Sequence, residues 1–253
     1  MRKVLVAFAL KEEFAPWRRR HRFHSVSTSQ YDVYATSFGP TEVCVALTGV
    51  GALGAHRFND LIAQFTPTLG IVTGVAAGLK PEWRPGDLLA AQSVCAPDGK
   101  ERIPGDLDLI ALAVQCGAKP APALITLPHI ARTTVEKARL ASLGDAADME
   151  SFPSMKPWSA RGIPCLALRA ILDPVEMPMS CDFEAALDAH GQVRITKILA
   201  QLARRPQLLP DFLHLARQSR RVLIRLAHFL DRFFDALDRP SSPAAAHLLS
   251  PKP

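Results

Sequence analysis

The chain has 253 residues, of which 48% are hydrophobic, and its 30 Lys/Arg against 24 Asp/Glu give a net charge of +6. This length allows one α/β domain of about 200 residues plus an appendage. The five cysteines are widely spaced and form no CxxC pair, which argues against a disulfide framework or a zinc site and predicts a reducing, cytoplasmic compartment. No apolar run approaches the roughly 20 residues of a membrane-spanning helix.

Apolar, β-rich runs alternate with helical patterns from residue 1 to about residue 185. We expect strands at 4–10, 31–38, 42–49, 68–74, 87–94, 121–127 and 164–172. We expect helices at 52–65, 106–116 and 133–142. This alternation is typical of a largely parallel sheet with helices on its faces, and it predicts one α/β domain over residues 1–192.

The segment after residue 192 differs in charge and pattern. Residues 1–196 hold 20 basic and 20 acidic side chains, whereas residues 197–253 hold 10 and 4. In 211–239, apolar residues recur at spacings of three, four or seven, namely Phe212, Leu215, Val222, Leu226, Phe229, Phe233 and Leu237. We therefore predict a basic amphipathic helical extension over 193–239, followed by a disordered, Pro/Ser/Ala-rich tail over 240–253.

Two interpretations of this basic helix remain open. It can lie on an anionic membrane surface and hold the chain on the inner face of the membrane, or it can pack on the domain or a dimer partner. Nucleic-acid binding is disfavoured, because no base-stacking aromatic side chains are interleaved on the polar face.

Polar residues and glycine loops collect where the predicted strands end. They are Glu12 and Glu13 after 4–10, GVGALG at 49–54, GVAAG at 74–78, Met149-Glu150, and Asp173 after 164–172. In open α/β sheets, ligands bind at the carboxyl ends of the strands, so this pattern predicts a cleft for a polar ligand. Singly, Glu12 and Glu13 also suit a helix N-terminus, and Asp173 also suits a turn.

Several kinds of site are disfavoured. GVGALG fits GxGxxG, but the next strand lacks the acidic residue of a dinucleotide site. His21 and His24 lie in RRRHRFH, where the arginines would repel a metal cation, and no GxSxG motif is present. We expect neither a metal nor a bound cofactor.

Five stretches resemble the nucleoside phosphorylase and methylthioadenosine/S-adenosylhomocysteine nucleosidase superfamily: ALKEEF (9–14), LTGVGALGA (47–55), IVTGVAAGLKPEWRPGDLL (71–89), ADMES (147–151) and GIPCLALRAILD (162–173). The DMES motif and the run at 172–226 resemble the hopanoid-associated phosphorylases, also described as adenosylhopane nucleosidases. The resemblance implies a three-layer α/β/α fold with a mixed, mostly parallel sheet. It further implies a homo-oligomer that cleaves the N-glycosidic bond of an adenine nucleoside, with adenosylhopane as the substrate.

The resemblance also implies roles for particular residues. Asp173 would protonate or hydrogen bond the purine, and Glu13 would orient the attacking water. Glu150 would hold the ribose hydroxyls with Met149 packed against the sugar, and Arg169 would position the acids. Gly51 and Gly74 belong to the two glycine loops, and His129 and Ile130 fall where the superfamily places a residue against the base. For the neighbouring acids, Asp145 is expected to be solvated, and Asp148 either supports the site or ends the strand.

Departures from the superfamily pattern bear on the nucleophile. Val75 and Leu172 stand where relatives carry serines, and the first of these often contacts phosphate or water. Glu13 would repel phosphate, so water is favoured, although phosphate stays open as a co-substrate. Pro157 is expected to kink or break the helix after Glu150. The alternatives are a nucleosidase for soluble methylthioadenosine-type substrates and a non-catalytic nucleoside- or lipid-binding relative.

Overall fold

The computed structural model describes residues 2–26, 32–51, 55–179, 182–186 and 194–239. The strands are β1 Lys3–Phe8, β2 His24–Val26, β3 Asp32–Phe38, β4 Thr41–Leu47, β5 Leu69–Gly78, β6 Leu88–Ala91, β7 Ser93–Cys95, β8 Arg102–Pro104, β9 Lys119–Ala121, β10 Leu124–Thr126, β11 Ala146–Asp148 and β12 Cys165–Asp173. The helices are α1 Lys11–Arg18, α2 Ala55–Phe65, α3 Leu107–Gln115, α4 Thr134–Leu140, α5 Ser151–Ser159, α6 Ile195–Arg204 and α7 Leu209–Leu237, with a 3₁₀ turn at Pro206–Leu208.

The described strands form one mixed sheet with β5 at its centre. Strand β5 pairs in parallel with β1 and β12 and antiparallel with β11. Parallel pairs also join β1 to β4 and β10 to β11, while β3 runs antiparallel to β4. The carboxyl ends of β1, β4 and β12 therefore point to the same edge of the sheet, with β1 ending beside Thr73 in the middle of β5 and β12 ending beside Ala77 near its end.

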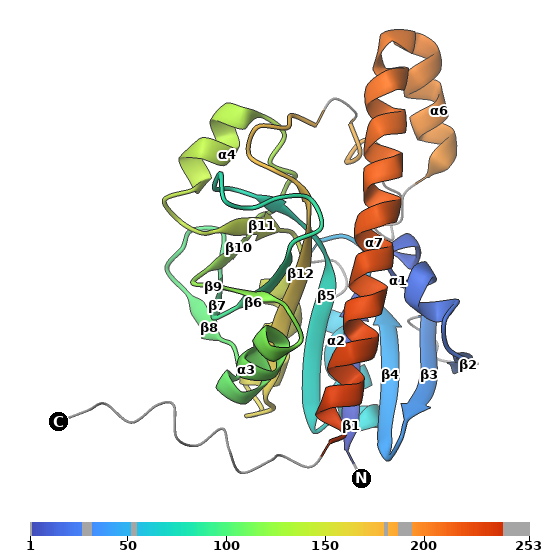
Figure 1. Ribbon diagram of the computed structural model, residues 1–253, viewed down its shortest axis with the longest axis vertical. Coiled ribbons are helices and arrows are strands. Elements are labelled where there is room, and N and C mark those ends of the chain that lie inside the picture. The colour runs from blue at the N-terminus through green and yellow to red at the C-terminus, as the bar shows by residue number, and fades with distance from the viewer. Residues whose placement is uncertain (1, 27–31, 52–54, 180–181, 187–193, 240–253) are drawn as a thin grey trace, which may run out of the picture.

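Helices cover both faces of the sheet and make a three-layer molecule (Figure 1). On one face, α1, α3 and α7 bury side chains such as Trp17, Leu109 and Phe229 against the strands. On the other face, α2 and α5 bury Phe58, Met155 and Trp158. The three-layer α/β fold predicted from the sequence is confirmed.

The strand predictions differ from the structure mainly where the chain bends. The run 87–94 is two strands, β6 and β7, which separate at Gln92, and the run 121–127 holds β10 and the end of β9. Each is too short for its apolar pattern to show the break. The short strands β2 and β8 were not predicted. The start of the glycine-loop helix at 52–54, the predicted boundary at 192/193 and the tail 240–253 lie outside the described residues.

Helix α7 is 29 residues long and packs its apolar face against the sheet. Val222, Leu226, Phe229 and Phe233 are all at most 3% exposed. Asp231 of α7 accepts a hydrogen bond from Trp17 Nε1 of α1 at 3.0 Å. The face of α7 that carries these residues therefore packs on the domain, as one of the two interpretations of this helix predicts. Within the described part of the chain, no helix combines the length and apolar character needed to cross a membrane.

Two local expectations were wrong. Pro157 does not break helix α5, which continues to Ser159, because the proline removes only its own N–H donor and lies close to the end of the nine-residue helix. Asp145 is only 4% exposed rather than solvated. It precedes β11, which lies inside the sheet between β5 and β10, and its carboxylate is paired with Lys80 Nζ at 2.6 Å and accepts the Ala123 N–H.

Candidate active site

Glu13 in the first turn of α1 joins three elements at the carboxyl end of β1. One carboxylate oxygen, Oε2, accepts the backbone N–H of Leu10 at 3.0 Å, which satisfies a free donor at the start of α1. The other, Oε1, accepts the N–H of Val75 in β5 at 2.9 Å. Glu13 is buried whereas Glu12 is exposed. The helix-start interpretation and the site interpretation of this glutamate are therefore compatible.

Gly74 lets the backbone of β5 pass between Glu13 and Arg169. Its φ is +143°, and a Cβ there would lie 2.5 Å from Glu13 Oε1 and 2.8 Å from Arg169 Nη1. Arg169 on β12 pairs in register with Gly74 and is fully buried. A side chain at residue 74 would push these two charged groups apart, so glycine is required here. Val75, in contrast, contributes a backbone N–H that any residue but proline would supply.

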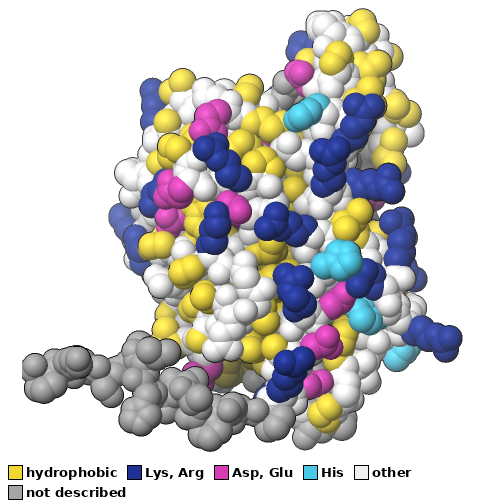
Figure 2. Space-filling model, in the orientation of Figure 1, with side chains coloured by type: hydrophobic (Ala, Val, Ile, Leu, Met, Phe, Trp, Pro, Cys, Tyr) yellow, Lys and Arg dark blue, Asp and Glu magenta, His cyan; other side chains and the backbone are white. Residues whose placement is uncertain are grey.

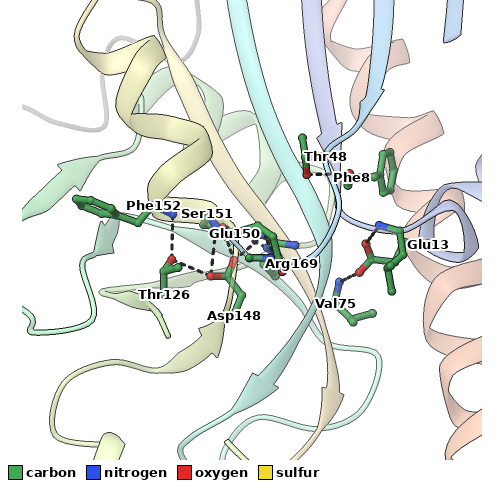
Figure 3. A network of polar contacts seen from close by, with 12 residues as sticks. Phe8, Glu13, Thr48, Val75, Thr126, Asp148, Glu150, Ser151, Phe152 and Arg169 are labelled. Atoms are coloured by element: carbon green, nitrogen blue, oxygen red, sulfur yellow. Dashed lines mark hydrogen bonds and ion pairs between the residues drawn. The ribbon is translucent and has the colours of Figure 1, made fainter. Parts of the chain in front are cut away.

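Arg169 lies between Glu13 and a second group of acids at the end of β11 (Figure 3). Its Nη2 lies 2.6 Å from Asp148 Oδ2 and 3.7 Å from Glu150 Oε2. Asp148 also accepts hydrogen bonds from the hydroxyls of Thr126 and Ser151. Asp148, left open by the sequence, thus holds Arg169 in place. Four buried side-chain atoms of the described residues have no hydrogen-bond partner, and two of them lie here, Thr73 Oγ1 and Arg169 Nη1; the others are Trp83 Nε1 and Trp158 Nε1.

Glu150 faces the glycine loop after β4. Its Oε1 accepts the backbone N–H of Gly51 at 3.1 Å, and Gly51 has a φ of +80°. The pKa of Glu150 is raised to about 8, chiefly by burial, which Arg169 opposes and the neighbouring Asp148 and Glu13 carboxylates reinforce. Burial likewise raises the pKa of Glu13, which Arg169 and the backbone N–H donors oppose. Met149, between Asp148 and Glu150, is half-buried.

Asp173 is the last residue of β12 and is held by a lysine that was not predicted from the sequence. Lys137 of α4 is fully buried. Its ammonium donates to Asp173 Oδ2, to the Pro174 carbonyl at 3.0 Å and to the Met177 carbonyl at 2.7 Å, so all three of its N–H donors are used. Burial raises the pKa of Asp173 to about 6, although Lys137 acts to lower it. Asp173 is therefore a buried acid that changes protonation near neutral pH.

The loop before α4 carries His129 and Ile130. His129 Nε2 lies 2.7 Å from Glu136 Oε1, and its side chain is half-exposed. The Ile130 N–H donates to Glu184. The contacts of these two residues are thus with Glu136 and Glu184, while the carboxylate cluster is assembled from Glu13, Asp148, Glu150 and Arg169.

Buried acids and one arginine lie at the carboxyl ends of neighbouring strands, next to two glycine turns, which is where α/β sheets commonly bind small polar ligands. Residues 3–204 match the family described as the Phosphorylase superfamily, and the chain belongs to that superfamily. None of the curated protein sequences matches this chain.

Solved structures give the same fold at low sequence identity. The chain is 18% identical to the 5′-methylthioadenosine/S-adenosyl homocysteine nucleosidase of Campylobacter jejuni, with a TM-score of 0.71 over 93% of this chain and 99% of that one. It is 17% identical to the futalosine hydrolase of Helicobacter pylori, with a TM-score of 0.71 over 92% and 97%. A single-residue variant of the Helicobacter pylori nucleosidase was solved with 5′-methylthioadenosine in its active site. The chain is 17% identical to it, with a TM-score of 0.69 over 93% of this chain and 99% of that one.

Proposed function

We propose that this protein cleaves the N-glycosidic bond of an adenine nucleoside and releases adenine from adenosylhopane, with water attacking ribose C1′. The observation that carries the proposal is that one edge of the sheet holds both a cluster of buried acids with an arginine and a separate buried acid. Glu13 and Arg169 are buried beside Gly74, with Glu150 next to Arg169, and Asp173, an acid with a pKa of about 6, ends the adjoining strand β12. Membership of the phosphorylase superfamily and the nucleosidase structures support the reaction class.

The reaction sets different requirements at its two ends. Positive charge develops on the ribose as the bond breaks, and negative charge develops on the departing base. In the proposed mechanism, Glu150 binds the ribose hydroxyls, Met149 packs against the sugar, and Gly51 holds Glu150 in place. Asp173 donates its proton to the purine so that adenine leaves as a neutral molecule. His129 and Ile130 approach the base from the loop before α4.

Charge at the sugar end favours water over phosphate as the nucleophile. Arg169, the cation of the cluster, already lies close to Asp148 and Glu150, and Glu13 adds a third carboxylate. Because Asp148 already neutralises the charge of Arg169, little positive charge remains to hold a phosphate dianion at this position. Glu13 Oε1, held by the Val75 N–H, is instead suited to accept a proton from water during its attack on C1′.

The test is adenine release from adenosylhopane dispersed in detergent, assayed with and without inorganic phosphate. We expect free adenine in both conditions, and we expect Asp173→Asn and Glu13→Gln to abolish it. No adenine in either condition would refute the proposed activity. Release that depends strictly on phosphate would change only the nucleophile.

The similarity to solved methylthioadenosine nucleosidases favours a second candidate, a nucleosidase for soluble methylthioadenosine-type substrates. Assaying 5′-methylthioadenosine beside adenosylhopane separates the two, because the better substrate has the larger kcat/KM. A non-catalytic binding protein would instead bind both without turnover, and Asp173→Asn would then leave affinity unchanged.

A further inference from the structure

Helix α7 carries a second stripe on the side away from its buried face. Leu209, Leu213, Arg217, Arg220 and Ile224 follow one another at spacings of four, four, three and four residues, and all are exposed. These spacings place them on one side of the helix. The three apolar residues of this stripe, Leu209, Leu213 and Ile224, are 41–46% exposed, whereas the apolar residues on the opposite face of α7 are buried. The stripe is therefore available to a partner outside the domain.

Helix α6 extends this surface. Its Ile195 and Leu199, one turn apart, are 67% and 57% exposed. Ile198 and Leu202 on its other side pack with Phe212 of α7. Figure 1 shows α6 and the first half of α7 as a hairpin that projects beyond the sheet. We define the helical hairpin as residues 194–225.

The helical hairpin is strongly basic. It contains eight basic residues and one acidic residue, Asp211, which gives a formal charge of +7. The basic residues are all exposed, namely Arg194, Lys197, Arg204, Arg205, Arg217, Arg220, Arg221 and Arg225. Figure 2 shows dark-blue side chains running down this part of the molecule, with hydrophobic ones near the tip. A second copy of the same surface would bring like charges together, which disfavours a symmetric contact between two hairpins.

We propose that the helical hairpin binds the surface of an anionic lipid bilayer. Ile195, Leu199, Leu209 and Leu213 enter the boundary between headgroups and acyl chains, and the surrounding arginines contact the headgroups. This differs from the sequence-based assignment to 211–239 in one respect. The second half of α7 is buried on the sheet, so the lipid contact belongs to the hairpin.

The α7 arm of the hairpin contacts the segment that follows Asp173. A cavity of about 210 Å³ lies between Met177–Met179 and the first turns of α7, where Phe212 and Leu215 form its wall. Gln218 Nε2 of α7 donates to the Leu172 carbonyl at 2.6 Å. Lipid binding by the hairpin therefore places the bilayer surface near the strand end that carries Asp173. The proposal is argued from this surface alone and does not depend on the substrate proposed above.

The test is co-sedimentation of the full chain with vesicles of phosphatidylcholine, with or without about 30% phosphatidylglycerol. We expect sedimentation with the anionic vesicles only, weakened by added salt. The triple variant Arg217→Gln/Arg220→Gln/Arg221→Gln should bind about 100-fold more weakly, since each basic residue near the surface contributes about fivefold. Leu199→Gln/Leu209→Gln/Leu213→Gln should also release the protein.

The matched controls are two triple variants with Gln substitutions of exposed basic or exposed apolar residues outside the helical hairpin. Lys100, Arg102 and Arg139 are exposed basic residues, and Leu107, Val114 and Val135 are exposed apolar residues. Their Gln variants should bind vesicles as the wild type does, and melting curves verify that every variant is folded. The proposal is overturned if the wild type stays in solution with anionic vesicles, or if the control variants lose as much binding. It is also overturned if the hairpin variants change the oligomeric mass and the wild type ignores vesicles.

Adenine release from detergent-dispersed substrate separates this proposal from the enzymatic one. The hairpin variants should retain that activity, because none of the changed residues belongs to the carboxylate cluster. Loss of vesicle binding with full activity would leave the proposed reaction standing. Vesicle binding without adenine release would leave the hairpin proposal standing.

Discussion

At residue 74, the absence of a side chain determines whether Glu13 and Arg169 can be neighbours. We expect Gly74→Ala to lower kcat/KM for adenine release at least about 100-fold, because its Cβ would displace both side chains by about an ångström. The measurement is steady-state kinetics together with thermal unfolding.

Gly117→Ala is the matched control for backbone strain. Gly117 also has a positive φ, +101°, but nothing lies within 4 Å of its Cβ position. Both variants should lose roughly 1–2 kcal/mol of stability from strain, and only Gly74→Ala should lose activity. Equal activity in the two variants would mean that the position of Glu13 does not limit the reaction.

Lys137 should set the pH at which Asp173 changes protonation. If Asp173 acts as the general acid, kcat/KM falls as pH rises through its pKa of about 6. Lys137 lowers that pKa, so Lys137→Met should raise it and move the fall in activity toward alkaline pH by about 1–2 units. The measurement is kcat/KM for adenine release across the pH range.

Lys156→Met serves as the control for this shift, because Lys156 forms an exposed pair with Glu101. The control should keep the wild-type profile. An unshifted profile in Lys137→Met would show that Asp173 is not the titrating acid. A merely structural role of Lys137 would lower stability at every pH without moving the profile.

The placement of the acids of the candidate site at strand ends could be predicted from the sequence, but the cation beside Asp173 could not. Glu13, Glu150 and Asp173 each follow an apolar strand, and strand ends meet at one edge. Lys137 lies in TTVEKARLAS, where neighbouring Glu136 and Arg139 make it look like part of a solvated helix face. Its burial depends on a partner 36 residues away, and such a pairing leaves no local pattern.

At the scale of elements, the two faces of α7 have different consequences for stability. Phe233 is fully buried against the sheet, whereas Ile224 is 41% exposed. We expect Phe233→Ala to lower the free energy of unfolding by about 3–5 kcal/mol and Ile224→Ala by less than about 0.5 kcal/mol. Urea unfolding measures both. Similar small losses would show that α7 contributes little to the core.

The same contrast explains how far the elements could be predicted. The period of three and four residues in 211–239 predicts an amphipathic helix and its apolar face, but not the surface that this face covers. The contact with α1 depends on residues 214 positions apart, Trp17 and Asp231. The short strands β2 and β8, and the breaks that divide β6 from β7 and β9 from β10, could not be predicted for a different reason, since three or four residues show too little alternation.

At the scale of the whole molecule, the buried carboxyls of the site should make stability fall as pH rises. Burial raises the pKa of Glu150 from 4.5 to about 8 and that of Asp173 from 3.8 to about 6. Between the unfolded and folded values, the unfolded chain releases protons that the folded chain keeps. The unfolding free energy therefore declines with pH in this window, by at most about 1.4 kcal/mol per pH unit for each group.

Glu150→Gln isolates the contribution of one of these carboxyls. A neutral amide has no proton to lose, so the variant should have a flatter dependence of Tm on pH between about pH 5 and about pH 8 and a higher Tm at the alkaline end. Differential scanning calorimetry of both proteins measures this. The exposed control Glu82→Gln should reproduce the wild-type dependence. If Glu150→Gln instead melted lower than the wild type at about pH 8, the ionised carboxylate would be stabilised by Arg169 and Gly51 more than burial opposes it.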